Sequence, residues 1–68
     1  MPDALRKDLV AIILNEAFSY NEAYIDHWLS GKEPDRNNPE PNHDDRDCLE
    51  RAHHIVSRFE ARCSRIDG

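Results

Sequence analysis

Apolar residues recur every three or four positions in two stretches of this chain, and a polar stretch rich in proline separates them. The first pattern covers residues 3–30 and the second covers residues 43–66. Such spacing is typical of amphipathic α-helices. Between them, residues 31–42 contain three prolines, which remove backbone donors and end helices. The sequence therefore predicts an all-α fold, with residues 1–68 forming a single domain built as an antiparallel helical hairpin.

Residues suited to helix ends lie at the predicted boundaries. Pro2 and Asp3 favour a helix start, and Gly31 suits the position just after a helix end. Asn42 or Asp44 can cap the start of the second helix by accepting hydrogen bonds from its free amides. These signals agree with the boundaries drawn from the apolar pattern.

The second predicted helix has a single apolar face. At about 100° per residue, its apolar side chains fall on one narrow stripe. The stripe consists of Cys48, Leu49, Ala52, Ile55, Val56, Phe59, Cys63 and Ile66. One neighbouring helix is enough to cover a stripe of this width.

The first predicted helix is apolar around most of its circumference. One face consists of Leu5, Leu9, Ile12, Ile13, Ala17, Tyr20 and Tyr24, and a second consists of Leu14, Phe18, Ile25 and Leu29. Because a helix of this kind is normally buried on both faces, we expect a second copy of the chain to complete a C2 homodimer, a four-helix bundle. The expected core and dimer residues are Leu9, Ile13, Leu14, Phe18, Ile25, Leu29, Ile55 and Phe59.

Four residues of the second helix, Glu50 to His53, have the E-x-x-H spacing. This motif resembles the metal-binding motif of ferritin-like bundle proteins, in which both side chains project into the bundle. The resemblance implies a di-metal site of oxidase type completed by Glu16 from the first helix. Glu50, however, points almost opposite the centre of the apolar stripe. We therefore expect no cofactor and no enzymatic activity, and retain a metal-binding bundle protein as an alternative.

Charge and cysteine placement narrow the functional class. A formal net charge of −5 at pH 7 argues against general attraction to nucleic acid or to anionic lipid. The longest apolar run, residues 9–14, is shorter than the ~20 residues that span a bilayer. Met1 to Asp3 is not the basic start of a signal peptide. Cys48 and Cys63 would lie roughly 22 Å apart on one helix, too far for a disulfide. Cysteines that do not pair are typical of a reducing compartment. We therefore expect a cytoplasmic protein.

Three aromatic residues form a ridge near the end of the first predicted helix. Tyr20, Tyr24 and Trp28 are spaced four residues apart. Aromatic side chains are enriched among the residues that anchor protein interfaces. The ridge also adjoins the proline-rich loop, and loops carry recognition disproportionately. The ridge is either core packing or a surface for a protein partner.

Arginines line one side of the second helix. They are Arg51, Arg58, Arg62 and Arg65. Arginine suits the recognition of phosphate or of an acidic protein surface. The alternative is pairing within the hairpin, in which Asp8 lies near Arg62 or Arg65, and Glu22 or Asp26 lies near Arg51. Such pairs fix the register of two helices and add only ~0–1 kcal/mol each.

Together these features predict a small regulatory protein that binds a larger protein: an inhibitor, an anti-activator or an adaptor. Acidic helical hairpins of this size commonly act so in bacteria and phages. One form of the predicted regulator is therefore an inhibitor of phage or mobile-element type that targets a host protein. The predicted partner-binding residues are Tyr20, Tyr24, Trp28, Arg58 and Arg62. The metal-binding bundle protein with Glu16, Glu50 and His53 is one alternative. A nucleotide or nucleic-acid binder that uses the arginines is the other, and the roles of Glu16 and His27 stay open.

Overall fold

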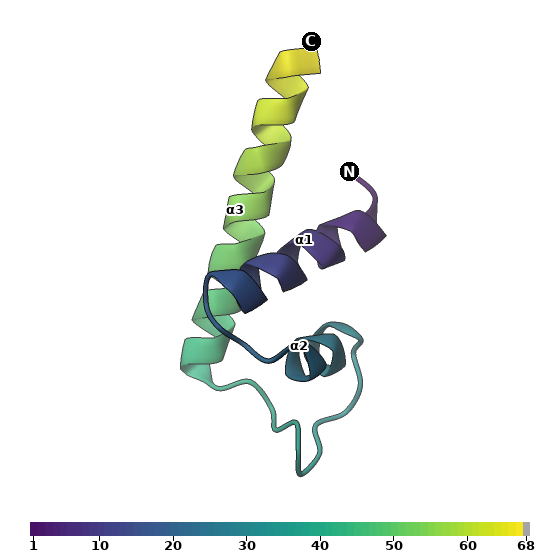
Figure 1. Cartoon of the computed structure of the whole chain (residues 1–68), viewed down its shortest axis with the longest axis vertical. Helices are drawn as coiled ribbons and strands as arrows, with labels where there is room; N and C mark the ends of the chain where they lie inside the picture. Colours follow the sequence, from purple (N-terminus) through teal and green to yellow (C-terminus); the bar gives the residue numbers. More distant parts are fainter. Residues whose placement is uncertain (68) are drawn as a thin grey trace.

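The computed structural model describes the backbone of residues 1–67 and the side chains of residues 1–65. It contains three helices, which are α1 (Asp3–Glu16), α2 (Glu22–Leu29) and α3 (His43–Asp67). Helix α3 runs along the long axis of the molecule, α1 leans across it, and α2 lies beside the last turns of α1 (Figure 1). The predicted all-α fold is confirmed. The side chain of Ile66, at the end of the predicted apolar stripe, lies outside the described residues.

The prediction of one continuous helix over residues 3–30 is wrong, because the chain leaves the helix after Glu16. Ser19 adopts a left-handed backbone conformation with φ of 61°, and one such residue ends a helix. The Tyr20 amide donates to the Leu14 carbonyl at 3.0 Å, and the Asn15 side chain donates to the Tyr20 carbonyl at 2.8 Å. These bonds hold the turn in which the chain changes direction.

Helix α2 begins at a cap that the apolar pattern does not reveal. The side-chain oxygen of Asn21 accepts hydrogen bonds from the amides of Ala23 and Tyr24 at 2.8 and 3.3 Å. Asparagine is among the residues preferred at this position. The three helices thus replace the two of the expected hairpin.

Each helix contributes to one small apolar core. Five side chains are fully or almost fully buried: Val10, Leu14, Ile25, Ala52 and Val56. Phe18, Trp28 and Leu29 pack against this core and are half-buried. The second apolar face expected for the first helix, formed by Leu14, Phe18, Ile25 and Leu29, is therefore covered within a single chain.

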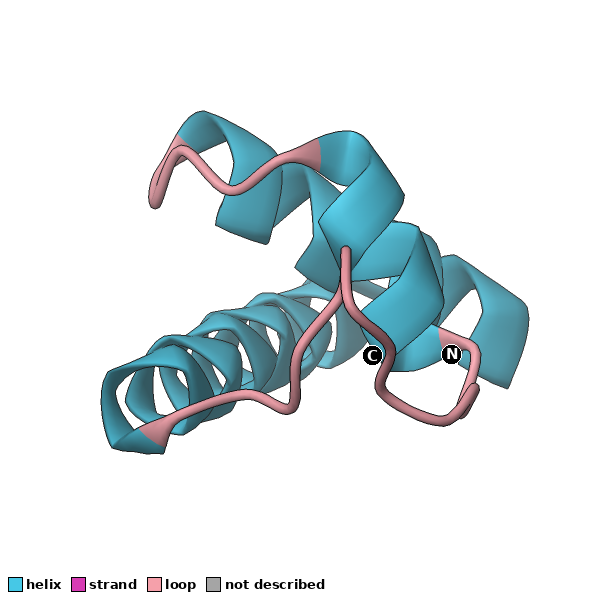
Figure 2. Ribbon diagram, turned by 90° about the horizontal axis from the view of Figure 1, so that it is seen from below, coloured by secondary structure: helices cyan, strands magenta, loops and turns pink. Residues whose placement is uncertain are grey.

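The connection between α2 and α3 is a long loop that passes below α2 in the view of Figure 1 and is drawn in pink in Figure 2. Gly31 begins it with a φ of 76°, which glycine adopts without strain. His27 Nε2 lies 2.8 Å from the Glu33 carbonyl. Asp35 accepts hydrogen bonds from the amides of Asn37 and Asn38, and the bond from Asn38 is the main cause that lowers its pKa. The connection is thus a sequence of local turns.

A capping arrangement starts α3. The Asn42 side chain accepts a hydrogen bond from the Asp45 amide at 2.8 Å, and the Asp45 carboxylate accepts one from the Asn42 amide at 3.1 Å. The exchange satisfies two amides that the helix itself leaves without acceptors. The prediction that Asn42 can cap this helix is confirmed.

Candidate protein-binding surface

Large apolar side chains of α1 and α3 remain exposed on one surface, which we call the apolar face. It consists of Leu5, Leu9, Ile12, Ile13, Ile55 and Phe59. Ile12 is 56% exposed, Phe59 54%, Leu5 47% and Ile55 38%, while Leu9 and Ile13 are half-buried. Single exposed apolar residues are common on proteins, but a contiguous set marks a surface that binds something.

A shallow hollow lies in the middle of the apolar face. Leu9 and Ile13 of α1 form one wall, and Ile55, Val56 and Phe59 of α3 form the other. Its volume is about 120 Å³, well below the ~300–1,000 Å³ of pockets that enclose small molecules. A hollow of this size and chemistry is suited to one or two apolar side chains of another protein.

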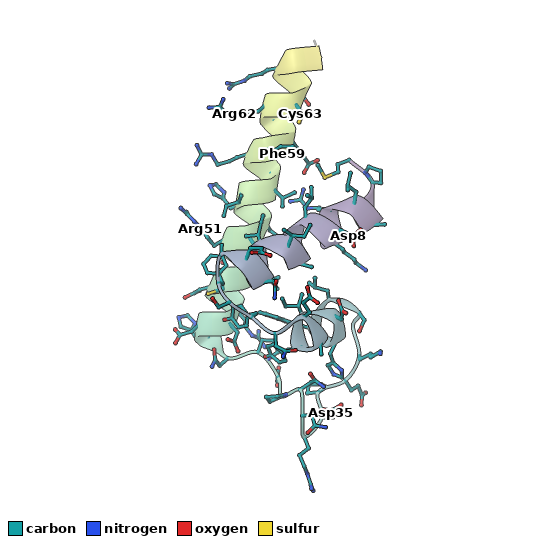
Figure 3. All side chains as sticks on the ribbon, in the orientation of Figure 1. Asp8, Asp35, Arg51, Phe59, Arg62 and Cys63 are labelled. Carbon is teal, nitrogen blue, oxygen red and sulfur yellow. The ribbon has the colours of Figure 1, made fainter. Side chains whose placement is uncertain are left out.

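Arginines border the apolar face along α3, and we call Arg51, Arg58 and Arg62 the arginine edge. Arg58 follows Ile55 by three residues and Arg62 follows Phe59 by three, so each lies next to an apolar residue of the face. In Figure 3, Arg51 and Arg62 project from the side of α3 that lies away from α1. All three are exposed, and none takes part in an ion pair among the described side chains.

Carboxylates border the opposite side of the apolar face, and we call Glu16, Glu22 and Asp26 the acidic edge. They line a hollow of about 290 Å³ between α1 and α2, whose apolar wall includes Ile12. All three are exposed, and within residues 1–65 they form no ion pair. The surface thus has acidic, apolar and basic zones in that order.

The ion pair that joins α1 to α3 is not one of those expected from the sequence. The Arg6 guanidinium pairs with Glu60 and donates to the Ser57 hydroxyl at 2.8 Å. The expected pairs of Asp8 with Arg62 or Arg65, and of Glu22 or Asp26 with Arg51, are absent from the ion pairs of the described side chains. The reason is geometric, since α1 crosses α3 at an angle and α2 turns away from it (Figure 1).

The aromatic ridge fastens α2 to the start of α3. The rings of Tyr20, Tyr24 and Trp28 lie 5.6–6.3 Å apart. The Tyr20 hydroxyl donates to Asp45 Oδ1 at 2.7 Å, and the Tyr24 hydroxyl donates to Asp45 Oδ2 at 3.4 Å. We call these four residues the aromatic clasp.

Protonation at the aromatic clasp follows from these bonds. The hydrogen bond from Tyr20 is the main cause that lowers the pKa of Asp45 below its ordinary 3.8. The same bond raises the pKa of Tyr20 well above its ordinary 10.0. Partial burial, and then the charge of Asp45, raises the pKa of Tyr24. Sequence reasoning missed Asp45, although its spacing from Asn42 is that of a capping pair.

The residues of the alternative metal site do not meet. Glu16 lies on the acidic edge, whereas Glu50 and His53 lie together on the outer surface of α3. Within the described side chains, no group of three or more His, Cys, Asp and Glu is placed to hold a metal ion. Cys48 and Cys63 are free thiols, each half-buried. A single chain therefore does not assemble the ferritin-like arrangement.

Comparison with known proteins identifies no relative of this chain. Matching the chain with protein-family models, curated proteins and solved structures gave no match. Over the described residues, none of the helices combines the length and the apolar character needed to cross a membrane.

Proposed function

We propose that this protein acts by binding a protein partner, either a different protein or a second copy of the chain, through its apolar face. The observation that carries the proposal is the exposure of Ile12 and Phe59, each more than half open to solvent. Burying the part of each side chain that is still exposed is favourable by about 1 kcal/mol. Leaving them exposed in a chain of 68 residues, whose own core is small, favours a partner that covers them.

The shape of the surface supports a binding role of the regulatory kind expected from the sequence. The central hollow takes side chains rather than a small molecule. Flanking charges of both signs give a partner a defined orientation, since charged rims select partners more than they add affinity. An inhibitor, an anti-activator or an adaptor needs such a face and no chemistry of its own. Two chains joined through this face would bring α1 and α3 of each copy together, in place of the four-helix bundle of two hairpins expected from the sequence.

The aromatic ridge is a secondary contact area in this proposal. Tyr20 and Tyr24 use their hydroxyls inside the chain, in bonds to Asp45. Their rings, like that of Trp28, are half-buried and less exposed than Ile12 and Phe59 of the apolar face, so they leave a partner less to bind. We therefore place the main contact at α1 and α3 and keep the ridge at its border.

Site-specific photo-crosslinking in living cells tests the proposal. A photoreactive amino acid replaces Phe59 in one variant and Ile12 in a second. A matched control carries it at Arg36, which is exposed in the connection between α2 and α3. We expect one discrete adduct from both face positions and none from Arg36, with the bound protein identified by mass spectrometry. Equal labelling from all three positions, or none from the face, would contradict the proposal.

A further inference from the structure

We infer that the apolar face binds a second copy of this chain, with the arginine edge of each copy lying against the acidic edge of the other. The inference rests on the proposed function and names its partner. It follows from the order of chemical zones across the surface and from the symmetry of a dimer.

The zones run across the molecule in one direction. Glu22 and Asp26 stand on α2 at one side, beside Ile12 of α1. The hollow lined by Leu9, Ile13, Ile55 and Phe59 lies in the middle. Arg62 projects from the far side of α3 (Figure 3), and Arg58, four residues before it in the same helix, shares that side. One edge is therefore negative, the other is positive, and the surface between them is apolar.

This order is complementary to itself. In a C2 dimer the twofold axis lies in the plane of the interface, and both copies use the same patch. An axis that runs along the hollow places each point of the face opposite the point on the other side of the axis. The arginine edge of one copy then meets the acidic edge of the other, and this contact occurs twice. The two hollows face each other, so that Phe59 of each copy can fill space next to Leu9 of the other.

The size of the surface is adequate for a stable pair. A specific interface of ordinary size takes about 800 Å² from each partner, which is about 15% of this chain's 5299 Å². Apolar side chains at the centre and charges at the rim is the usual arrangement of such interfaces. A chain this short also gains more than most from association, since five side chains are buried in its core among residues 1–65.

The same order of zones disfavours nucleic acid as the occupant. Phosphates attracted to Arg58 and Arg62 would also approach a chain whose formal net charge is −5. The acidic edge would then lie against the same polyanion, at a cost. A second copy satisfies both edges at once, and each edge needs no other partner.

Charge reversal separates this arrangement from any other. One variant carries Arg58→Glu and Arg62→Glu, which makes two of the three positions of the arginine edge acidic. The other carries Glu22→Arg and Asp26→Arg, which makes two of the three positions of the acidic edge basic. All four residues are exposed, which leaves the core intact, and circular dichroism confirms the fold. A matched control for the Arg58→Glu/Arg62→Glu variant carries Lys32→Glu and Arg36→Glu in the connection, with the same change in net charge away from the face.

Solution mass, measured by light scattering across dilution, gives the readout. We expect the wild type and the control to be dimers at about 100 µM, above the micromolar dissociation constants at the weak end of such interfaces. Each reversed variant alone loses at least about tenfold in affinity, because like charges oppose each other at both contacts. Mixing the two reversed variants restores a dimer, which contains one of each and is weakened again by added salt.

Two results would overturn the inference. A wild type that stays monomeric at about 100 µM shows that no second copy occupies the face. A wild-type dimer whose reversed variants do not recombine shows that the copies pair in another way. In either case, a discrete adduct of another protein at Phe59 or Ile12 would leave the proposed function standing. Failure of the crosslinking experiment as well would remove both.

Discussion

The two ends of the molecule use the same kinds of residue with opposite results. At the closed end, α2, the last turns of α1 and the first turns of α3 bury Leu14, Ile25 and Ala52 almost completely. At the open end, α1 begins and α3 extends past it, and there Leu5 and Phe59 are about half exposed. Figure 1 shows the far half of α3 rising alone beyond α1. The difference lies in how many helices meet at each end.

This contrast explains how one apolar stripe can have two roles. Along α3 the predicted stripe continues without a break from Ala52 to Phe59. Its first part, Ala52 and Val56, shares the buried core with residues of α1 and α2. The part beyond Val56 has the start of α1 beside it, fastened by Arg6 and Glu60. A periodic stripe shows that a face is apolar. The neighbouring helices decide whether it becomes core or an exposed surface.

The largest expected effect comes from removing bulk at the closed end. Leu14→Ala should lower the free energy of unfolding by about 2–5 kcal/mol, because it leaves a cavity at a fully buried position of a small core. That is a large part of the stability of so short a chain. Denaturant unfolding followed by circular dichroism measures the change.

Leu5→Ala is the matched control for this substitution. It makes the same chemical change on the same helix, at a side chain that is 47% exposed. At low protein concentration, where pairing of chains contributes least, we expect a loss of about 1 kcal/mol or less. Equal losses at Leu14 and Leu5 would mean that the two ends do not differ as described.

A smaller effect is expected at the aromatic clasp. Asp45→Asn replaces charge-assisted hydrogen bonds with neutral ones and should cost about 1 kcal/mol at pH 7, after allowance for solvent screening. The folded-state pKa of Asp45 lies below its ordinary 3.8. Its contribution is therefore present above pH 3.8 and is lost as the pH falls through the lower folded value. The variant should lack this part of the acid dependence.

Asp44→Asn controls for charge in the first turn of the same helix. Asp44 is exposed and lies beside the helix start, as Asp45 does. It should keep the acid dependence that the clasp produces, measured as unfolding midpoints between pH 7 and pH 2. If both variants show the same pH profile, the bonds from Tyr20 and Tyr24 do not govern acid stability.

The apolar pattern predicted much of the fold because helices impose a period on the sequence. It placed α3 and its cap at Asn42, and it identified Leu14, Ile25 and Val56 as apolar-face residues. It failed between Glu16 and Asn21, where no proline or glycine marks the end of a helix. The break depends on Ser19 taking a left-handed conformation, which tertiary packing selects and local sequence only permits.

The same break misled the prediction of the surface. Drawn as one helix, residues 3–30 have two apolar faces, one too many for a single neighbour. Drawn as two helices, the face of Leu14 and Ile25 becomes the core, and only the side of Leu5 and Ile12 stays open. The positions of side chains around each predicted helix could also not reveal the aromatic clasp, because Asp45 is distant in sequence from Tyr20. Asn21 was the available signal, as a capping residue inside a predicted helix.

The smallest expected effect tests that turn directly. Ser19→Gly should raise the free energy of unfolding by about 0.5 kcal/mol. The left-handed conformation costs a residue with a side chain about 1–2 kcal/mol, and glycine avoids this cost. Glycine also loses more conformational entropy on folding, which offsets part of the stabilisation. For a chain of this size the melting temperature should rise by about 2–4 °C, measurable by thermal denaturation.

Ser30→Gly is the matched control, because Ser30 follows α2 with a φ of −81° and has no such strain to relieve. It also loses the hydrogen bond from its hydroxyl to the His27 carbonyl, so its melting temperature should fall. Opposite shifts at the two serines support a left-handed turn at Ser19. A fall at both would mean that Ser19 stays right-handed in solution and that residues 3–30 form the continuous helix of the original pattern. The core around Leu14 and Ile25 would then come apart, and with it the distinction between a closed end and an open one.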